Sequence, residues 1–449
     1  MMVLVFLWSA NYVRIIGGEV DRTIGSNFEE CDCSNDRELY KNDNRNRNDN
    51  FSLEKADRLP NLTYLLEASK DNTSRKSYMR ASTSMLAAYE YSDQVAVQIL
   101  SMNMFLKTIY CHYFDRRGKN IGKPFKSFVF PESVIYCARR PKAKFISISE
   151  AEDGKREPPI RFIDRTNPVA EHFFSVCLAP VYGDEPKWLF LAEFIEHYKI
   201  QGATYFFIYI TDDLEPYDRV LLDDYVRTGN VEVISIVDRL LRDPRDWQTI
   251  QIHDCLLRNR YFSNWTAFVD MDERLLMNES GGTLEDFLMN ITQHDSKIGS
   301  VTFRQRWIHK SDNLPKRYKD VKQVKEWMPT QRYHNTTMVT PPGWVVKSIV
   351  QPHKVLYMWT HYPRKMYNGY RGYSVKPEQG VSRHYRLRSR FVWDRIPNRT
   401  HFEYTDYPAK YNDRLVDAVT QRLKYVYEFE AEESYRMPKY LRNWSEFFY

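Results

Sequence analysis

The 449-residue sequence lacks three features that would define its class at once. None of its six cysteines has the paired spacing of a zinc site, since Cys31 and Cys33 lie in an Asn-rich run without a second pair. The net charge of +6 includes no long basic block, which argues against nucleic acid as a partner. No apolar run near the start reaches the roughly 20 residues that span a bilayer.

The amino terminus, "MMVLVFLWSA", is nevertheless apolar, and we interpret residues 1 to 16 as a signal peptide or a signal anchor. A retained anchor would make the membrane a partner. Sequons of the form Asn-x-Ser/Thr are frequent, which favours the secretory pathway. They begin at Asn50, Asn61, Asn72, Asn264, Asn278, Asn290, Asn335, Asn398 and Asn443. We expect Asn264 to be unmodified because it adjoins a predicted buried strand.

The remaining cysteines suit an oxidising lumen. There, Cys111 and Cys137 are predicted to form a bridge within one domain. Cys177 and Cys255 either pair with each other or remain buried thiols.

Composition divides the chain into segments. Residues 17 to 77 are polar and aperiodic, as in "NDRELYKNDNRNRNDN", and predict a disordered stem. Residues 78 to 170 carry short β-type runs such as "VAVQIL" and "SVIYCA", which predict a small antiparallel β domain.

From residue 171 to residue 395, apolar strands alternate with amphipathic helices. "FFSVCLAPVY", "ATYFFIYI", "NVEVISIV" and "TAFVDMD" read as strands, and the segments between them read as helices. This alternation predicts an α/β fold with a parallel sheet covered on both faces, which binds ligands at the carboxyl ends of its strands. Residues 396 to 449 form a predicted helical segment, in which Leu415, Val419, Leu423 and Val426 share one face.

The stretch "WTAFVDMDERLL" places three acids directly after a predicted buried strand. These acids are Asp270, Asp272 and Glu273, and they repel one another unless a positive charge lies among them. In an extended segment, residues two apart point the same way, so Asp270 and Asp272 would present two carboxylates together. Hard oxygen ligands of this kind suit Mn²⁺ or Mg²⁺, which also bind diphosphate oxygens.

Three other interpretations compete. The acids could be solvated strand-end residues without a ligand. An aspartyl-phosphate phosphatase also carries Asp-x-Asp after an apolar strand, but Glu273 and Arg274 stand where such enzymes normally have Thr or Val. A glycosidase pair fits poorly, because its two carboxylates usually come from different strands and lie at least about 5 Å apart.

Several blocks, taken in order, resemble glycosyltransferase family 92. They are "CLAPVYGDEPKWLFLAEFIEHYKIQGATYFFIYI", "VLLDDYVRTGNVEVI", "DWQTIQIHDCLLRNRYFSNWTAFVDMDERL" and "KSIVQPHKVLYMWTH". The resemblance implies a Rossmann-like GT-A domain in a type II membrane protein of the Golgi. It further implies an inverting, Mn²⁺-aided transfer of a hexose, typically galactose from UDP-galactose, to a glycan or glycoprotein.

The resemblance also suggests site residues. Asp270 and Asp272 match the metal-binding Asp-x-Asp motif, and His361 matches a late histidine that completes the metal site in such enzymes. Glu273 is expected to hold the motif by bonding to backbone or to Arg274.

The donor nucleotide is expected at the end of the first strand of the α/β domain. Pro180 and Tyr182 stand where GT-A enzymes hold uracil and ribose. Asp254, on the helix before the motif, either orients donor hydroxyls or is a helix-surface acid.

The sequence does not identify the catalytic base. Glu378 and His384 fall where an acceptor-side loop is expected, but each could equally be a surface residue. Our leading hypothesis is therefore a metal-dependent glycosyltransferase of the secretory pathway. The alternative is a catalytically silent glycan-binding protein on the same fold, and a hydrolase comes third.

Overall fold

A computed structural model describes residues 84–100, 104–183, 185–211, 213–236, 244–343, 345–387 and 402–429. The predicted signal segment (1 to 16), the predicted stem (17 to 77), Cys31 and Cys33 lie outside the described residues. All of the described residues, and so both main sheets, belong to one compact unit.

The first sheet has seven short strands in the order β4-β3-β6-β7-β1-β2-β5. All its pairings are antiparallel except that of β1 with β7. The predicted Cys111–Cys137 disulfide is confirmed and joins β3 to β5. The strands are β1 (Met85–Glu90), β2 (Gln94–Ile99), β3 (Thr108–Phe114), β4 (Phe125–Phe128), β5 (Val134–Ala138), β6 (Phe145–Ser149) and β7 (Ile160–Asp164).

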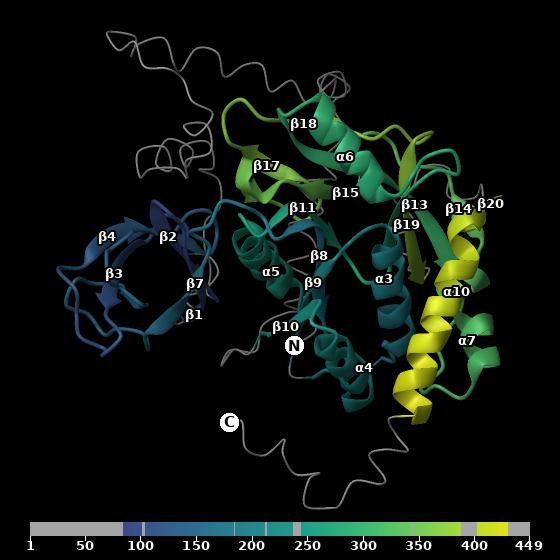
Figure 1. The fold of residues 1–449 in the computed structure, drawn as a ribbon, viewed down its shortest axis with the longest axis horizontal. Coiled ribbons are helices and arrows are strands. Elements are labelled where there is room, and N and C mark those ends of the chain that lie inside the picture. The colour runs from purple at the N-terminus through teal and green to yellow at the C-terminus, as the bar shows by residue number, and fades with distance from the viewer. Residues whose placement is uncertain are drawn as a thin grey trace, which may run out of the picture. The chain divides into compact units, whose positions relative to one another are not determined.

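The second sheet begins with four parallel strands in the order β10-β9-β8-β11. They are β8 (His172–Val181), β9 (Tyr205–Ile210), β10 (Val231–Ser235) and β11 (Ser263–Val269). The helices between them are α3 (Trp188–Ile200), α4 (Pro216–Arg227) and α5 (Pro244–Asn259). Figure 1 shows α3 and α5 on opposite sides of these strands.

Strand side chains alternate between two apolar cores. Phe206 and Ile208 pack with the residues of α3 and α4, whereas Phe207 and Tyr209 pack with those of α5. A strand buried on both faces needs an unbroken apolar sequence, which is why "YFFIYI" has no polar position. The expected α/β fold, a Rossmann-like GT-A arrangement preceded by a β-rich part, is confirmed by this topology.

The sheet continues through β15 (Val346–Val350), which runs antiparallel between β11 and β13 (Ile298–Lys310). Beyond β13 lie β14 (Asn335–Thr337) and β20 (Phe402–Tyr404). β12 (Glu273–Met277) pairs with β19 (Gly380–Leu387), and β18 (Arg371–Ser374) pairs with β13. β16 (Val355–Met358) and β17 (Pro363–Met366) form a separate pair.

Helices cover this second half of the sheet. The segment between β13 and β15 contains α7 (Val321–Trp327) and α8 (Pro329–Arg332) in addition to β14. α6 (Leu284–His294) follows β12, and α10 (Ala409–Lys424) packs on α3. The predicted apolar face of the last helix is confirmed, because Leu415, Val419 and Leu423 are fully buried.

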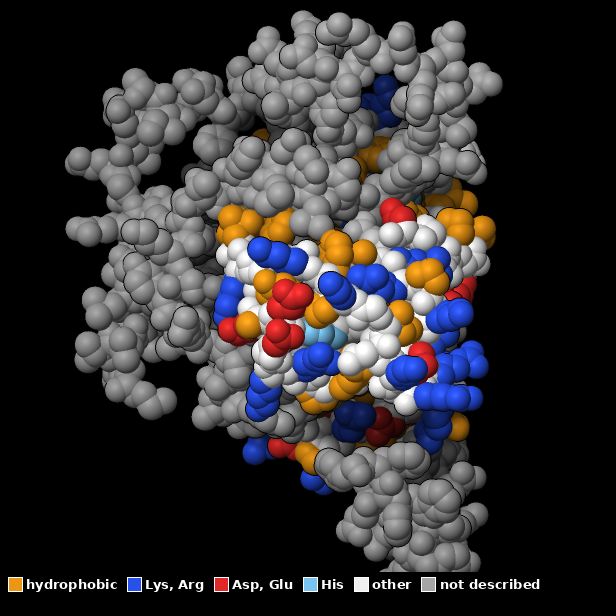
Figure 2. Space-filling view, turned by 90° about the vertical axis from the view of Figure 1, so that its left-hand side faces the viewer, with side chains coloured by type: hydrophobic (Ala, Val, Ile, Leu, Met, Phe, Trp, Pro, Cys, Tyr) orange, Lys and Arg blue, Asp and Glu red, His pale blue; other side chains and the backbone are white. Residues whose placement is uncertain are grey.

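Charge is mixed on one face of the described part of the protein. In Figure 2, Lys and Arg side chains lie among acidic and apolar ones on the face that is shown. Among the described helices, none combines the length and the apolar character that crossing a bilayer requires.

Cys177 of β8 and Cys255 of α5 also form a disulfide, which settles the open question about this pair. It joins residues 78 apart, against 26 for Cys111–Cys137. In the chain-entropy model, loops of these lengths contribute about 4.5 and about 3.5 kcal/mol. Asn259 donates to both sulfur atoms and loses these bonds when the cysteines are replaced.

We therefore expect Cys177→Ala/Cys255→Ala to lose about 1 kcal/mol more unfolding free energy than Cys111→Ala/Cys137→Ala. Urea unfolding followed by tryptophan fluorescence measures the difference. An equal or reversed order would show that loop length does not govern the stabilisation here.

Candidate functional site

The three acids lie at a tight turn between β11 and β12. β11 ends at Val269, and the carbonyl of Asp270 accepts a hydrogen bond from the backbone N–H of Glu273 at 3.0 Å. The expectation of an extended segment is therefore wrong: Asp270 and Asp272 belong to a turn, and their side chains find different partners.

Glu273 fixes this turn. Its Oε2 accepts from the backbone N–H of Asp270 at 2.9 Å, so the expected bond to backbone is confirmed. Its Oε1 accepts from Gln305 Nε2 at 2.6 Å. Burial raises the pKa of the Glu273 carboxyl to about 7, although the Lys347 ammonium opposes this rise. With both oxygens occupied inside the protein, Glu273 serves as a support for the motif.

Arg274 pairs elsewhere. Its guanidinium lies 3.1 Å from Glu193 of α3, and both side chains are fully buried. Glu193 also accepts from the backbone and the hydroxyl of Thr330. This buried pair anchors β12 to α3 directly after the acidic turn.

Lys347 supplies a positive charge among the acids. It comes from β15, its side chain is only 2% exposed, and its Nζ lies 2.9 Å from Asp270 Oδ2 and 3.1 Å from Glu273 Oε2. Burial would lower the pKa of Lys347, yet the two carboxylates hold it above its ordinary value. The ammonium therefore stays charged.

Asp272 meets a second basic group, His384 of β19. The imidazole Nε2 lies 3.2 Å from Asp272 Oδ2, and the Asp272 side chain is 31% exposed. Burial would raise the pKa of Asp272, but His384 lowers it to about 2. Conversely, burial would lower the pKa of His384, and Asp272 raises it. The two groups thus stabilise each other's charged forms.

His361 lies close to the same turn. Its Nδ1 is 3.1 Å from the carbonyl of Val346, which can only accept, so Nδ1 carries the proton and Nε2 keeps its lone pair. Burial and the Lys347 ammonium lower the pKa of His361 to about 4. A neutral imidazole held by a carbonyl through its other nitrogen is the usual form of a metal-ligating histidine.

A small recess opens beside Asp270. It lies between α5, the ends of β8 and β11, β15 and Thr360, and its polar lining consists of Gln248, Gln251, Asp270, Lys347 and Thr360. Gln248 donates to Asp270 Oδ1 at 2.9 Å. The recess therefore lies at the carboxyl edge of the parallel strands, where such sheets bind ligands.

Pro180 and Tyr182 lie at the same edge. Pro180 is buried near the end of β8, and Tyr182 is 41% exposed just beyond it. Their neighbour Ala179 lines the recess. The assignment of Pro180 and Tyr182 to the nucleotide remains a prediction.

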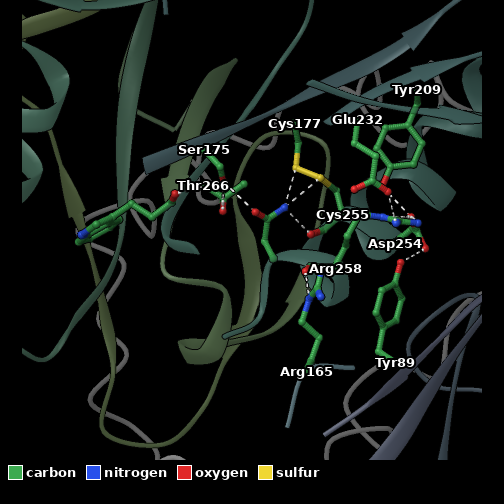
Figure 3. The surroundings of a disulfide bond; sticks show 12 residues. Tyr89, Arg165, Ser175, Cys177, Tyr209, Glu232, Asp254, Cys255, Arg258 and Thr266 are labelled. Atoms are coloured by element: carbon green, nitrogen blue, oxygen red, sulfur yellow. Dashed lines mark hydrogen bonds and ion pairs between the residues drawn. A yellow bond between two sulfur atoms is a disulfide. The ribbon is translucent and has the colours of Figure 1, made fainter. Parts of the chain in front are cut away.

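Asp254 lies elsewhere. It is fully buried on α5, where it accepts hydrogen bonds from Tyr89 and Tyr209 at 2.6 Å each and pairs with Arg258 at 3.1 Å (Figure 3). Both of its oxygens are occupied by these groups, so none is left for a donor hydroxyl. Asp254 is therefore not a helix-surface acid, and we correct its donor-binding assignment to a structural role that joins α5 to β1 and β9.

Sequence reasoning missed three polar residues of the site: Lys347, Gln248 and Gln305. Lys347 carried a signal, because it is the only charge in the apolar run "VVKSIV". His384 had been placed on an acceptor-side loop as a residue of undecided role, but it is a buried strand residue. Glu378 is exposed and precedes that strand, where its backbone carbonyl accepts from Asn278.

The donor atoms suit a hard divalent cation. Asp270 and Asp272 are each about one-third exposed, and His361 offers Nε2. Among the described residues, however, no three His, Cys, Asp or Glu side chains are already gathered as a metal-binding group. The types of ligand atom therefore fit a divalent cation. The Asp270 carboxylate, however, is already hydrogen-bonded to Lys347 and Gln248.

Acids and a neutral histidine at the carboxyl edge of a parallel sheet do not by themselves identify the class of protein. The family model named "Glycosyltransferase family 92" matches residues 172–423, more than half of the chain. The protein belongs to this family and is, in class, a glycosyltransferase.

Similarity to individual proteins is more limited. The chain is 35% identical over 86 residues to galactan beta-1,4-galactosyltransferase GALS1 of Arabidopsis thaliana. This match covers 19% of the chain and 17% of that relative.

Solved structures resemble the chain weakly. A mannosyltransferase from Pyrobaculum calidifontis, in complex with GDP-Man and Mn²⁺, is 10% identical with a TM-score of 0.25 and covers 62% of this chain and 85% of its own. HddC from Yersinia pseudotuberculosis is 12% identical with a TM-score of 0.22, covering 48% and 90%. These TM-scores are too low to support an argument about the site.

If Asp254 has a structural role, its replacement should lower the stability of the protein without weakening nucleotide binding. Asp254→Asn should cost about 2 kcal/mol of unfolding free energy, because it removes a buried carboxylate that Arg258 and two tyrosine hydroxyls share, while Glu232 still pairs with Arg258. The variant should still bind nucleotide as the wild type does. Chemical denaturation and calorimetry measure the two quantities.

Asp272→Asn is the matched variant, since it neutralises an acid that is partly exposed at the turn. It should lose less stability than Asp254→Asn and more nucleotide affinity. If Asp254→Asn kept full stability but lost nucleotide binding, its assignment to the donor site would be restored.

Proposed function

We propose that this glycosyltransferase is metal-dependent and transfers a hexose, with inversion, from a UDP-sugar to a glycan hydroxyl. The observation that carries the proposal is the pair of partly exposed carboxylates, Asp270 and Asp272, at the carboxyl edge of the parallel strands beside neutral His361. UDP-galactose is the leading donor, supported by family membership and by the relative named as a galactosyltransferase.

Asp270, Asp272 and His361 would hold the cation, Mn²⁺ or Mg²⁺. A bound divalent ion supplies positive charge where negative charge develops on the leaving diphosphate. Glu273 keeps the backbone of Asp270 in its turn, and Gln248 orients the Asp270 carboxylate. The rim formed by Pro180 and Tyr182 is the proposed place of the uracil and ribose.

We also propose that the protein works in the lumen of the secretory pathway, in the Golgi, as a membrane protein if its amino-terminal segment is retained. Two disulfides support an oxidising compartment. Asn264, Asn290 and Asn335 are exposed and available as glycan acceptors. The exposure of Asn264 overturns the reason given above for expecting it to be unmodified.

Calorimetry with the full chain tests the proposal. UDP-galactose and UDP should bind in the presence of Mn²⁺, and EDTA should abolish the binding. Asp272→Ala should weaken binding by roughly 10- to 100-fold or more, because it removes a carboxylate proposed to ligate the metal.

Glu378→Gln is the control, since it neutralises an exposed acid outside the acidic turn and the recess. It should bind as the wild type does. Absence of binding of either nucleotide with metal present would favour the alternative, a glycan-binding protein on this fold. Release of sugar from a glycan without any nucleotide sugar would favour a hydrolase.

A further inference from the structure

Lys347 is an unusual lysine because its charge is enclosed. The side chain is 2% exposed, and its Nζ lies within 3.1 Å of two carboxylates. One of them, Glu273, is fully buried and is further occupied by Gln305 and the Asp270 backbone. The other is Asp270, which belongs to the proposed metal site. A permanent positive charge therefore already occupies the acidic turn.

The consequence for Asp270 is that both its oxygens face N–H donors. Oδ2 accepts from Lys347, and Oδ1 accepts from Gln248. Among the described residues, by contrast, the Asp272 carboxylate has a hydrogen-bond partner only on Oδ2, and the His361 ring has one only on Nδ1. In the free protein, the atoms readily offered to a cation thus come from Asp272 and His361.

Building on the proposed function, we propose that Lys347 is an internal counter-cation that keeps divalent metal from binding tightly to the free enzyme. Metal and donor diphosphate then bind together. A divalent ion at Asp270 meets the ammonium at close range, and two like charges a few ångströms apart in a protein interior repel by several kcal/mol. Diphosphate oxygens add negative charge and further ligands, which offset this repulsion.

A second buried lysine in the same region serves as a comparison. Lys354 is 7% exposed, and its Nζ donates to the carbonyl of Ser296 at 2.7 Å. It belongs to the short segment between β15 and β16, and its Nζ also donates to the carbonyl of Ile298. Lys354 therefore matches Lys347 in type and depth but not in its contact with the acids.

The test measures Mn²⁺ binding by calorimetry, with and without saturating UDP, for the full-length wild type, Lys347→Met and Lys354→Met. The wild type should bind Mn²⁺ weakly alone and at least about tenfold more tightly with UDP. Lys347→Met should bind Mn²⁺ alone at least about tenfold more tightly than the wild type and lose most of the enhancement by UDP. Lys354→Met should behave as the wild type.

Removal of Lys347 alone leaves buried Glu273 unpaired and could unfold the protein. The double variant Glu273→Gln/Lys347→Met removes the buried pair together, a change that often preserves stability. It also keeps the summed charge of the four residues Asp270, Asp272, Glu273 and Lys347 unchanged. This variant should likewise bind Mn²⁺ alone more tightly, because Asp270 is freed from the ammonium.

Equal Mn²⁺ affinity of wild type and double variant would overturn the inference and leave the proposed function standing. Tight binding of Mn²⁺ to the wild type without UDP would do the same. If the wild type bound no Mn²⁺ even with UDP, the metal-dependent function itself would fail, and the inference with it.

Discussion

The structure around the acidic turn depends on the ion pair that Lys347 makes with Asp270 and Glu273. Three carboxylates within four residues cannot be enclosed without an opposing charge. β15 provides it because this strand runs antiparallel beside β11, with Phe268 opposite Ser348. Lys347 precedes Ser348 in β15, and in an antiparallel pair it therefore lies beside the end of β11, where the acids begin. If β15 ran parallel to β11, the loop after β15 would lie beside the acids in place of Lys347.

Helix α5 connects this ion pair to the rest of the protein. Gln248 near its start holds Asp270, Cys255 ties its middle to β8, and Asp254 receives the hydroxyl of Tyr89 from β1 (Figure 3). The β-rich part thus contacts the helix that orients a residue of the site. Because the disulfide and the Asp254 hydrogen bond are buried, the helix has little freedom to shift without breaking one of them.

Local pattern was enough to predict the alternation of strands and helices, because each buried strand requires a continuous apolar run and each helix an apolar face. It was also enough to find Asp270 and Asp272, since acids after a buried strand are conspicuous. It did not predict the turn at Asp270 or the burial of Asp254. Both depend on partners far along the chain, Gln305 for the turn and Tyr89 for Asp254, and strand register across the sheet is not encoded locally.

The charges around the Asp-x-Asp motif determine how much positive charge a bound metal can offer to an anionic donor. Asp270, Asp272 and Glu273 carry three negative charges when ionised, and Lys347 carries one permanent positive charge. His384, whose pKa Asp272 raises, adds a second positive charge when it is protonated, so one or two negative charges remain. A divalent ion at the turn then leaves at most one positive charge for a diphosphate, which carries two negative charges in a nucleotide sugar. Arg386 and Lys310, which both interact electrostatically with Asp272, lie on that side of the turn. Recognition of an anionic donor therefore has to draw on basic residues outside the motif, and the surrounding strands β13 and β19 supply them.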